Sequence, residues 1–126
     1  MYLFISSKDS SLIHLQNNSC EFISELPKTI NIPGEWSCAL MECHIGDKKG
    51  EDLLICCDLV ENSCVHGKLV PVLTIISQSG AVDHPYYVPI CRDQIYRLRI
   101  RLLTVEGKIP SIKPSECRIV LHITKD

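Results

Sequence analysis

The feature that most constrains this chain is a strict two-residue alternation between apolar and polar side chains in two of its segments. Within Ile95–Thr104, one face of an extended strand collects Tyr96, Leu98, Ile100 and Leu102, and the other collects Arg97, Arg99 and Arg101. Glu116–Thr124 repeats the pattern, with Cys117, Ile119, Leu121 and Ile123 opposite Arg118, Val120 and His122. This period is typical of half-buried antiparallel strands. We therefore expect both segments to cover a core.

Turn-forming residues divide the rest of the chain into short β-segments. The expected strands are Tyr2–Ser6, Cys20–Leu26, Lys28–Ile32, Glu35–His44, Leu53–Val60, Leu69–Ser77, Ile95–Thr104 and Glu116–Thr124. Clusters such as Pro33-Gly34 and Ser79-Gly80 favour turns between them. No long stretch has helical periodicity, and Asp9–Gln16 is expected to form one helical turn at most. Short strands with frequent turns predict an all-β fold, an antiparallel β-sandwich or barrel.

Two of the expected strands, Leu53–Val60 and Leu69–Ser77, are apolar on both faces. A strand that is buried on one side only alternates, so a two-sided apolar strand needs cover on its second face. We expect these segments to be central strands, or strands that another copy of the protein covers.

Composition indicates one ordinary globular domain over residues 1–126, with 45% hydrophobic and 22% charged residues. The net charge of -2 gives no general attraction to nucleic acid or to an anionic membrane. No apolar run reaches the roughly 18 residues that a membrane-spanning helix needs. The start of the chain has no basic segment followed by a long apolar one, so we expect no secretory signal.

The chain has eight cysteines, at positions 20, 38, 43, 56, 57, 64, 91 and 117. Most lie in apolar strand-like runs, where a free cysteine acts as a small buried hydrophobic residue. Without an export signal the compartment is expected to be reducing. We therefore interpret the cysteines as free thiols rather than as a disulfide framework.

The sequence has few indications of catalytic or metal-binding chemistry. Zinc sites usually show paired Cys or His at short fixed spacings, and neither CxxC nor HxxxH occurs here. Cys64-Val65-His66 would put two potential ligands on one face of a strand, and Cys43 and His44 are neighbours. Nucleophile elbows, phosphate-binding loops and dinucleotide fingerprints are absent from the sequence. We expect no enzyme activity, no cofactor, no metal and no small-molecule substrate.

Arg97, Arg99 and Arg101 form a stripe along one strand face, with Arg92 shortly before it. The stripe fits a solvated outer face, and it fits a contact with carboxylates of a neighbouring subunit. Nucleic acid is the least favoured partner, because no exposed aromatic residue is interleaved with the arginines.

Two neighbouring tyrosines, Tyr86 and Tyr87, follow a turn at His84-Pro85. They fit a buried corner of the fold, and they fit an exposed protein–protein contact, where tyrosine is enriched. Trp36 is expected in the core. The candidate interface residues are Arg97, Arg99, Arg101, Tyr86 and Tyr87.

Several short stretches, taken together in this order, resemble a known family. They are Met1-Tyr2-Leu3-Phe4 with Ser6-Ser7, Glu25–Ile30 running to Gly34-Glu35-Trp36, Cys57–Glu61 followed by Leu69–Leu73, Pro85–Ile90, and Val120–Ile123. The chain resembles a family encoded by Polinton/Maverick-type elements and adintovirus-like DNA viruses, whose members look like minor capsid or penton-type proteins. Relatives carry a longer insertion before the segment that corresponds to Leu53–Val60, and here only Gly46–Asp52 bridges it.

The resemblance implies an eight-stranded single jelly-roll that builds a virus-like shell without catalysis. It implies a homo-oligomer, a pentamer or a trimer, with a major capsid protein as a further partner, in the virion or in the cytoplasm or nucleus of the host. The alternative is a small β-sandwich module that presents loops or a sheet edge to another protein. A cysteine- or metal-dependent enzyme is a third and weaker hypothesis.

Overall fold

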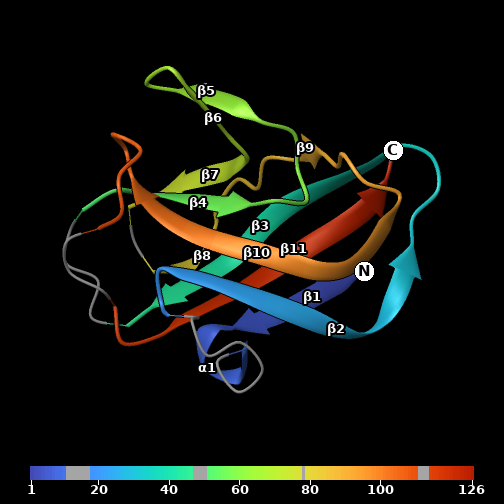
Figure 1. Ribbon diagram of the computed structural model, residues 1–126, viewed down its shortest axis with the longest axis horizontal. Helices are drawn as coiled ribbons and strands as arrows, with labels where there is room; N and C mark the ends of the chain where they lie inside the picture. Colours follow the sequence, from blue (N-terminus) through green and yellow to red (C-terminus); the bar gives the residue numbers. More distant parts are fainter. Residues whose placement is uncertain (11–17, 47–50, 78, 111–113) are drawn as a thin grey trace.

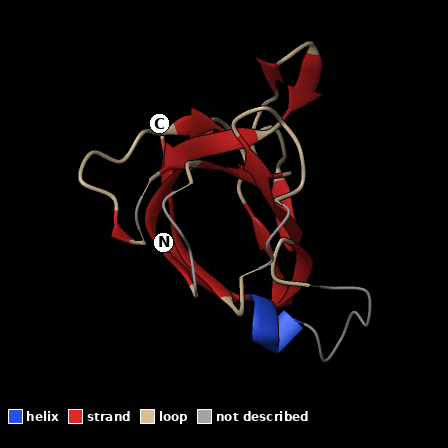
Figure 2. Cartoon of the chain, turned by 90° about the vertical axis from the view of Figure 1, so that its left-hand side faces the viewer, coloured by secondary structure: helices blue, strands red, loops and turns tan. Residues whose placement is uncertain are grey.

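Two antiparallel sheets pack face to face in the computed structural model, which describes residues 1–10, 18–46, 51–77, 79–110 and 114–126 (Figures 1 and 2). The first sheet has the order β1-β11-β3-β8, and β9 also pairs with β3. Its strands are β1 (Tyr2–Ser6), β11 (Cys117–Lys125), β3 (Trp36–Ile45), β8 (Gly80–Ala81) and β9 (Val88–Pro89).

The second sheet has the order β2-β10-β4-β7. Its strands are β2 (Glu21–Asn31), β10 (Gln94–Thr104), β4 (Leu53–Cys57) and β7 (Val72–Ile76). A separate hairpin joins β5 (Ser63–Val65) to β6 (Lys68–Val70), and one short helix, α1, spans Ser7–Ser10. In Figure 1 the hairpin lies above β4 and β7, and α1 lies at the opposite end of the view.

The order of the strands is that of a jelly-roll. The first main strand, β1, pairs with the last, β11, and the second, β2, pairs with the second to last, β10. In the same way β3 pairs with β8 and β9, and β4 pairs with β7. Such nested antiparallel pairing, split between two sheets of four positions, makes the double Greek key. The expected all-β sandwich is confirmed.

The described residues form eleven strands rather than the expected eight. Compared with the eight positions of a jelly-roll, the extra strands are the inserted β5–β6 hairpin and the division of one position between β8 and β9. No strand was expected at that position, and the expected strands Cys20–Leu26 and Lys28–Ile32 are the single strand β2. Pro71 separates β6 from β7, so the expected strand Leu69–Ser77 is two strands. Conversely, β2 continues through Pro27, which is tolerated because β2 is an edge strand and Pro27 falls in the irregular stretch between Glu25 and Ile30 that is not paired with β10. The expected strand Leu53–Val60 ends at Cys57, and Val60 makes only a single bridge to Ile90.

The inner faces of the two sheets form the main core. In β11 the inward residues are fully buried as the alternation predicted, and Arg118, Val120 and His122 face outward. In β10 Leu98, Ile100 and Leu102 are fully buried, but Tyr96 is 53% exposed. An irregularity in the pairing with β2 falls between Ile95 and Arg97, so Ile95 turns inward and Tyr96 outward. The placement of Tyr96 on the core face is therefore wrong.

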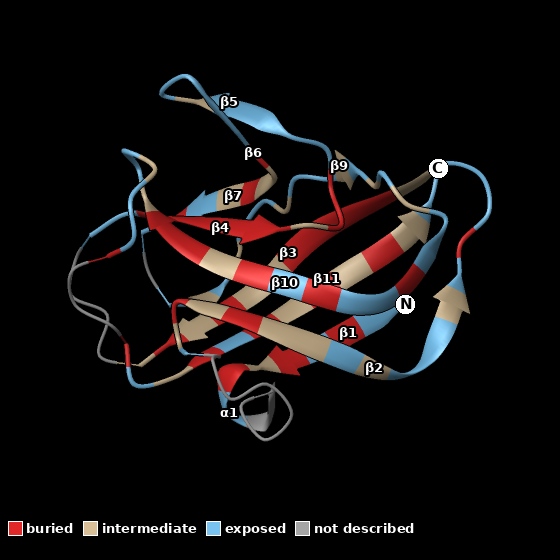
Figure 3. Cartoon of the chain, in the orientation of Figure 1, coloured by how far each residue is buried: buried red, intermediate tan, exposed pale blue. Residues whose placement is uncertain are grey.

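A second apolar cluster explains why β4 has no polar face. Its inner residues join the main core, and its outer residues, Leu54 and Cys56, pack with Val70 and Leu103. Val65 of β5 and Val72 of β7 close this cluster from outside. Figure 3 shows β4 buried along its whole length below the hairpin. The second face of β4 is therefore covered by this chain itself.

The short helix and Trp36 both differ from what the sequence predicts. A helical turn lies at Ser7–Ser10 and overlaps the expected segment Asp9–Gln16 at Asp9 and Ser10, and residues 11–16 of that segment lie outside the described part of the chain. Trp36 is only partly buried: it packs against the core and donates from Nε1 to the carbonyl oxygen of Pro33 at 2.8 Å.

Candidate functional site

The arginine stripe lies on the outer face of the second sheet, where β10 runs beside β2. Arg97 pairs with Glu25 at 2.8 Å, and Arg99 pairs with Glu21. Both carboxylates come from β2, so the chain itself supplies the acidic partners that were considered for a neighbouring subunit. Arg101 is half-buried and lies near Cys56, where its charge acts on that thiol. A contact between subunits at this stripe stays a prediction.

Arg92 holds the turn after β4 against the start of the stripe. Its guanidinium pairs with Asp58 at 2.6 Å and also donates to the carbonyl oxygen of Arg97 at 2.9 Å. The other carboxylate oxygen of Asp58 accepts the backbone N–H of Arg99 at 2.9 Å. This network ties the backbone of β10 to the turn at Asp58, so the arginine side chains project from a constrained strand.

The two tyrosines lie over the other sheet. Tyr87 is 40% exposed, and its hydroxyl lies 2.8 Å from Nδ1 of His122 on β11. The ring of Tyr2 lies on the other side of this contact, 4.6 Å from the His122 ring between centroids. Tyr86, by contrast, is 72% exposed. The structure therefore places Tyr86 and Tyr87 on an exposed surface rather than in a buried corner.

The structure does not bring the two groups of candidate residues together. The arginines face outward from the second sheet, and Tyr87 contacts the outward-facing His122 of the first. Because the two sheets pack face to face, these surfaces point away from each other. The arginine stripe and the contact of Tyr87 with His122 therefore lie on different faces of the molecule. Tyr96, however, is exposed beside Arg97 on β10, so the expectation that no exposed aromatic residue accompanies the stripe is wrong.

The outer face of the first sheet has an apolar surface that the sequence analysis did not select. Phe4 is 78% exposed and Tyr2 54% exposed, both on β1. Hollows of about 360 and 420 Å³ flank Phe4, and Val120 and Glu42 line both. The pattern of Tyr2–Ser6 contained the signal, since Leu3 and Ile5 alternate with Tyr2 and Phe4 and only one pair can enter the core.

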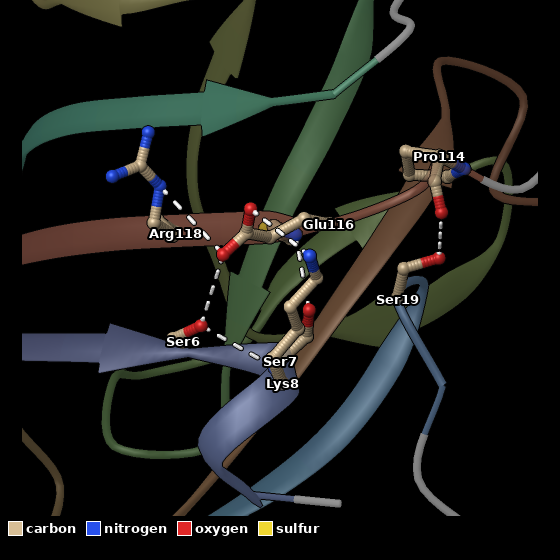
Figure 4. A network of polar contacts seen from close by, with 8 residues as sticks. Ser6, Ser7, Lys8, Ser19, Pro114, Glu116 and Arg118 are labelled. Atoms are coloured by element: carbon tan, nitrogen blue, oxygen red, sulfur yellow. Dashed lines mark hydrogen bonds and ion pairs between the residues drawn. The ribbon is translucent and has the colours of Figure 1, made fainter.

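A polar network closes the end of this sheet near α1 (Figure 4). Glu116 accepts a hydrogen bond from Ser6 and forms ion pairs with Lys8 and Arg118, each at 3.8 Å. Ser7 accepts the backbone N–H of Cys117 at 3.0 Å. The charges of Lys8, Glu116 and Arg118 at this end of the sheet are thus paired within the chain, whereas Glu42 lines the hollows beside Phe4.

All eight cysteines are free, and six are buried: Cys20, Cys38, Cys43, Cys56, Cys57 and Cys117. Burial raises the pKa of Cys38 to about 12. Burial also raises the pKa of Cys56 to about 11, although the charge of Arg101 opposes it. Burial raises the pKa of Cys57 further, and a hydrogen bond with Cys43 and burial raise that of Cys117. At neutral pH these four thiols stay protonated and are poor nucleophiles.

The proposed proximity of Cys64 and His66 on one strand face is wrong. His66 has a φ of 46° and Gly67 a φ of 78°, so both form the two-residue turn of the β5–β6 hairpin. The turn takes His66 out of the strand that carries Cys64. Within the described ranges, no group of three or more His, Cys, Asp or Glu side chains is arranged to hold a metal ion.

No protein-family model matches the chain, and no curated protein matches it. Among the helices in the described part of the chain, none has the length and apolar character to cross a membrane.

Proposed function

We propose that this chain is a structural, non-enzymatic capsid-type jelly-roll that assembles into a cyclic homo-oligomer, a trimer or a pentamer. The observation that carries the proposal is the placement of the candidate contact residues on opposite outer faces of one jelly-roll. A ring requires a head-to-tail contact, in which two different surfaces of each subunit meet. The resemblance to the Polinton/Maverick and adintovirus-like minor capsid family supports the same function.

The chemistry of the two surfaces suits such a contact. Tyr86 is exposed in the loop that leads to β9 of the first sheet, and the stripe of the second sheet presents guanidinium groups. Arginine stacks on aromatic rings, and Tyr and Arg are both enriched where subunits meet. In a ring, Tyr86 of one subunit would pack on Arg97, Arg99 and Arg101 of the next. Assembly with a major capsid protein, in the virion or the host cell, belongs to the same proposal.

The experiment that tests this function disables one surface at a time. One variant carries Tyr86→Ser, and a second carries Arg97→Ser, Arg99→Ser and Arg101→Ser together. Each should fail to form rings, because every contact in the ring needs both surfaces. An equimolar mixture should form a one-to-one dimer, because each variant retains the surface that the other lacks. Light scattering after size-exclusion chromatography measures these masses.

The control is Leu69→Ser, since Leu69 is also 72% exposed but lies on the β5–β6 hairpin rather than in the loop of Tyr86 or on β10. This variant should assemble like the wild type. The triple variant should remain folded, because an exposed ion pair contributes up to about 1 kcal/mol. A wild-type protein that forms no ring, or variants that still form rings, would reject the proposal and leave the arginines as a solvated surface.

The alternative function is a small β-sandwich module that binds another protein through a loop or a sheet edge. The β5–β6 hairpin favours it, because Leu69 on its outer side is 72% exposed. This function predicts a monomer or dimer and the loss of a bound partner when Leu69 is replaced by Ser. Rings that form normally from the Leu69→Ser variant would favour the capsid-type function instead.

A further inference from the structure

The four edge regions of the two sheets differ in how well they are protected against pairing with another strand. An exposed edge offers free backbone N–H and C=O groups, and proteins block it with charges, prolines, bulges or very short strands. The edge strand β2 has Glu25, Pro27 and Lys28 and an irregular register with β10. The edge strand β7 follows Pro71 and contains an extra residue, Leu73, in its pairing with β4.

The edge formed by β8 and β9 is short, with two residues in each strand. The fourth edge, β1, has none of these protections. Its sequence is Tyr-Leu-Phe-Ile-Ser, without a charge or a proline, and its register with β11 is continuous. An unprotected edge of this kind is a template for another strand.

The hydrogen bonds of β1 show which of its backbone groups face the free side. Met1 and Ile123 exchange both of their backbone hydrogen bonds, at 3.0 and 2.8 Å. In an antiparallel ladder such bonded pairs alternate with non-bonded ones, so Leu3 and Ile5 also face β11. The N–H and C=O groups of Tyr2 and Phe4 therefore point away from β11. No strand lies beyond β1 in the described part of the chain.

We propose that β1 pairs antiparallel with β1 of a second copy of this chain, which joins the two first sheets into one continuous sheet. About a two-fold axis, the same strand contributes to both sides of the contact. The sequence of β1 therefore needs to be complementary only to itself. Tyr2 and Phe4 of both copies then lie on the outer face, where aromatic cross-strand neighbours attract each other. Leu3 and Ile5 of both copies lie on the core side.

Charge also favours a second copy as the partner. Like charges opposite each other destabilise strand pairing, and β1 has no charged side chain. Of the charges near β1, Lys8 and Arg118 pair with Glu116 of their own chain, and the ammonium group of Met1 donates to the carbonyl oxygen of Ile123. Glu42 lies on β3, two strands in from this edge. The junction is small beside the roughly 800 Å² per partner of a typical stable interface. We therefore expect an association that depends on protein concentration.

This contact goes beyond the proposed ring. It joins the same strand of two copies about a two-fold axis, whereas the ring joins two different surfaces head to tail. The two can therefore fail independently. If rings form but β1 does not pair, this inference is wrong and the proposed function stands. If β1 pairs but no rings form, the proposed function is wrong and this inference stands.

The test compares Phe4→Pro with Phe4→Ala in the full chain. Both remove the aromatic ring, but only proline removes the N–H that faces the free edge. That N–H has no partner in β11, so the ladder within the chain stays intact, and circular dichroism should show the native β-fold for both variants. Sedimentation velocity from micromolar to submillimolar concentration should show that Phe4→Pro weakens the two-fold association at least about tenfold more than Phe4→Ala does.

Amide hydrogen exchange supplies a second readout. In the concentrated wild type, exchange at Tyr2 and Phe4 should slow at least about tenfold relative to the dilute protein, while the Leu3 amide, bonded within the chain, changes little. Equal association of the two Phe4 variants would overturn the proposal. So would fast exchange at Tyr2 and Phe4 in the concentrated wild type.

Discussion

Both sheets carry apolar residues on their outer faces, but the residues beneath the β5–β6 hairpin are buried and those on β1 are exposed. Leu54 and Cys56 face outward from the second sheet and are almost completely buried, because Val65, Val70 and Val72 of the same chain cover them. Tyr2 and Phe4 face outward from the first sheet and remain more than half exposed. The inserted β5–β6 hairpin accounts for the difference. An outward apolar residue therefore stabilises the monomer on one sheet and is left for contacts on the other.

Replacing an outward apolar residue should have very different costs on the two sheets. Leu54→Ala opens a cavity under the hairpin and should lower the free energy of unfolding by about 2–5 kcal/mol. Val120→Ala removes a half-buried side chain from the uncovered sheet and should cost about 1 kcal/mol or less. Denaturant titration of both variants measures the comparison. Equal costs would mean that the hairpin gives Leu54 no real cover.

A smaller change tests the hairpin itself. Gly67 has a positive φ of 78°, and a Cβ there would meet no other atom within 4 Å. Gly67→Ala should therefore cost about 1–2 kcal/mol from backbone strain alone. Loosening the hairpin should also speed the labelling of the Cys56 thiol beneath it, while labelling of the exposed Cys64 stays the same. Unchanged labelling of Cys56 would show that the hairpin does not control access to this cluster.

Much of the fold followed from local pattern. Alternation located the inward residues of β11 because each of them is flanked by outward residues, and turn residues separated most strands correctly. The alternation pattern gave wrong placements where the pairing between strands is irregular or where a strand lies at an edge. Tyr96 turns outward because β2 and β10 are irregularly paired beside it, and Pro27 lies inside a strand because that strand is at an edge. Neither effect can be deduced before the neighbouring strand is known.

The candidate site was harder to predict than the core. The sequence located the arginine stripe but not Glu21 and Glu25, whose position opposite it depends on the register of β2 with β10. From the sequence, Leu53–Val60 could be a central strand or a strand covered by a second copy. The structure shows that the hairpin of the same chain covers it. The unprotected edge at β1 was also invisible, because an edge exists only once the strand order is known.

Hydroxyl-radical footprinting of the wild type, dilute and concentrated, tests most directly whether the hairpin closes the outer apolar cluster of the second sheet while the outer apolar residues of the first sheet are left for assembly. The account predicts that Leu54 and Val70 are unreactive in both samples. Tyr2, Phe4 and Tyr86 should react in the dilute protein and become protected in the concentrated one. Reactive Leu54 and Val70 in the dilute sample, or Tyr2, Phe4 and Tyr86 that stay equally reactive in both, would contradict it.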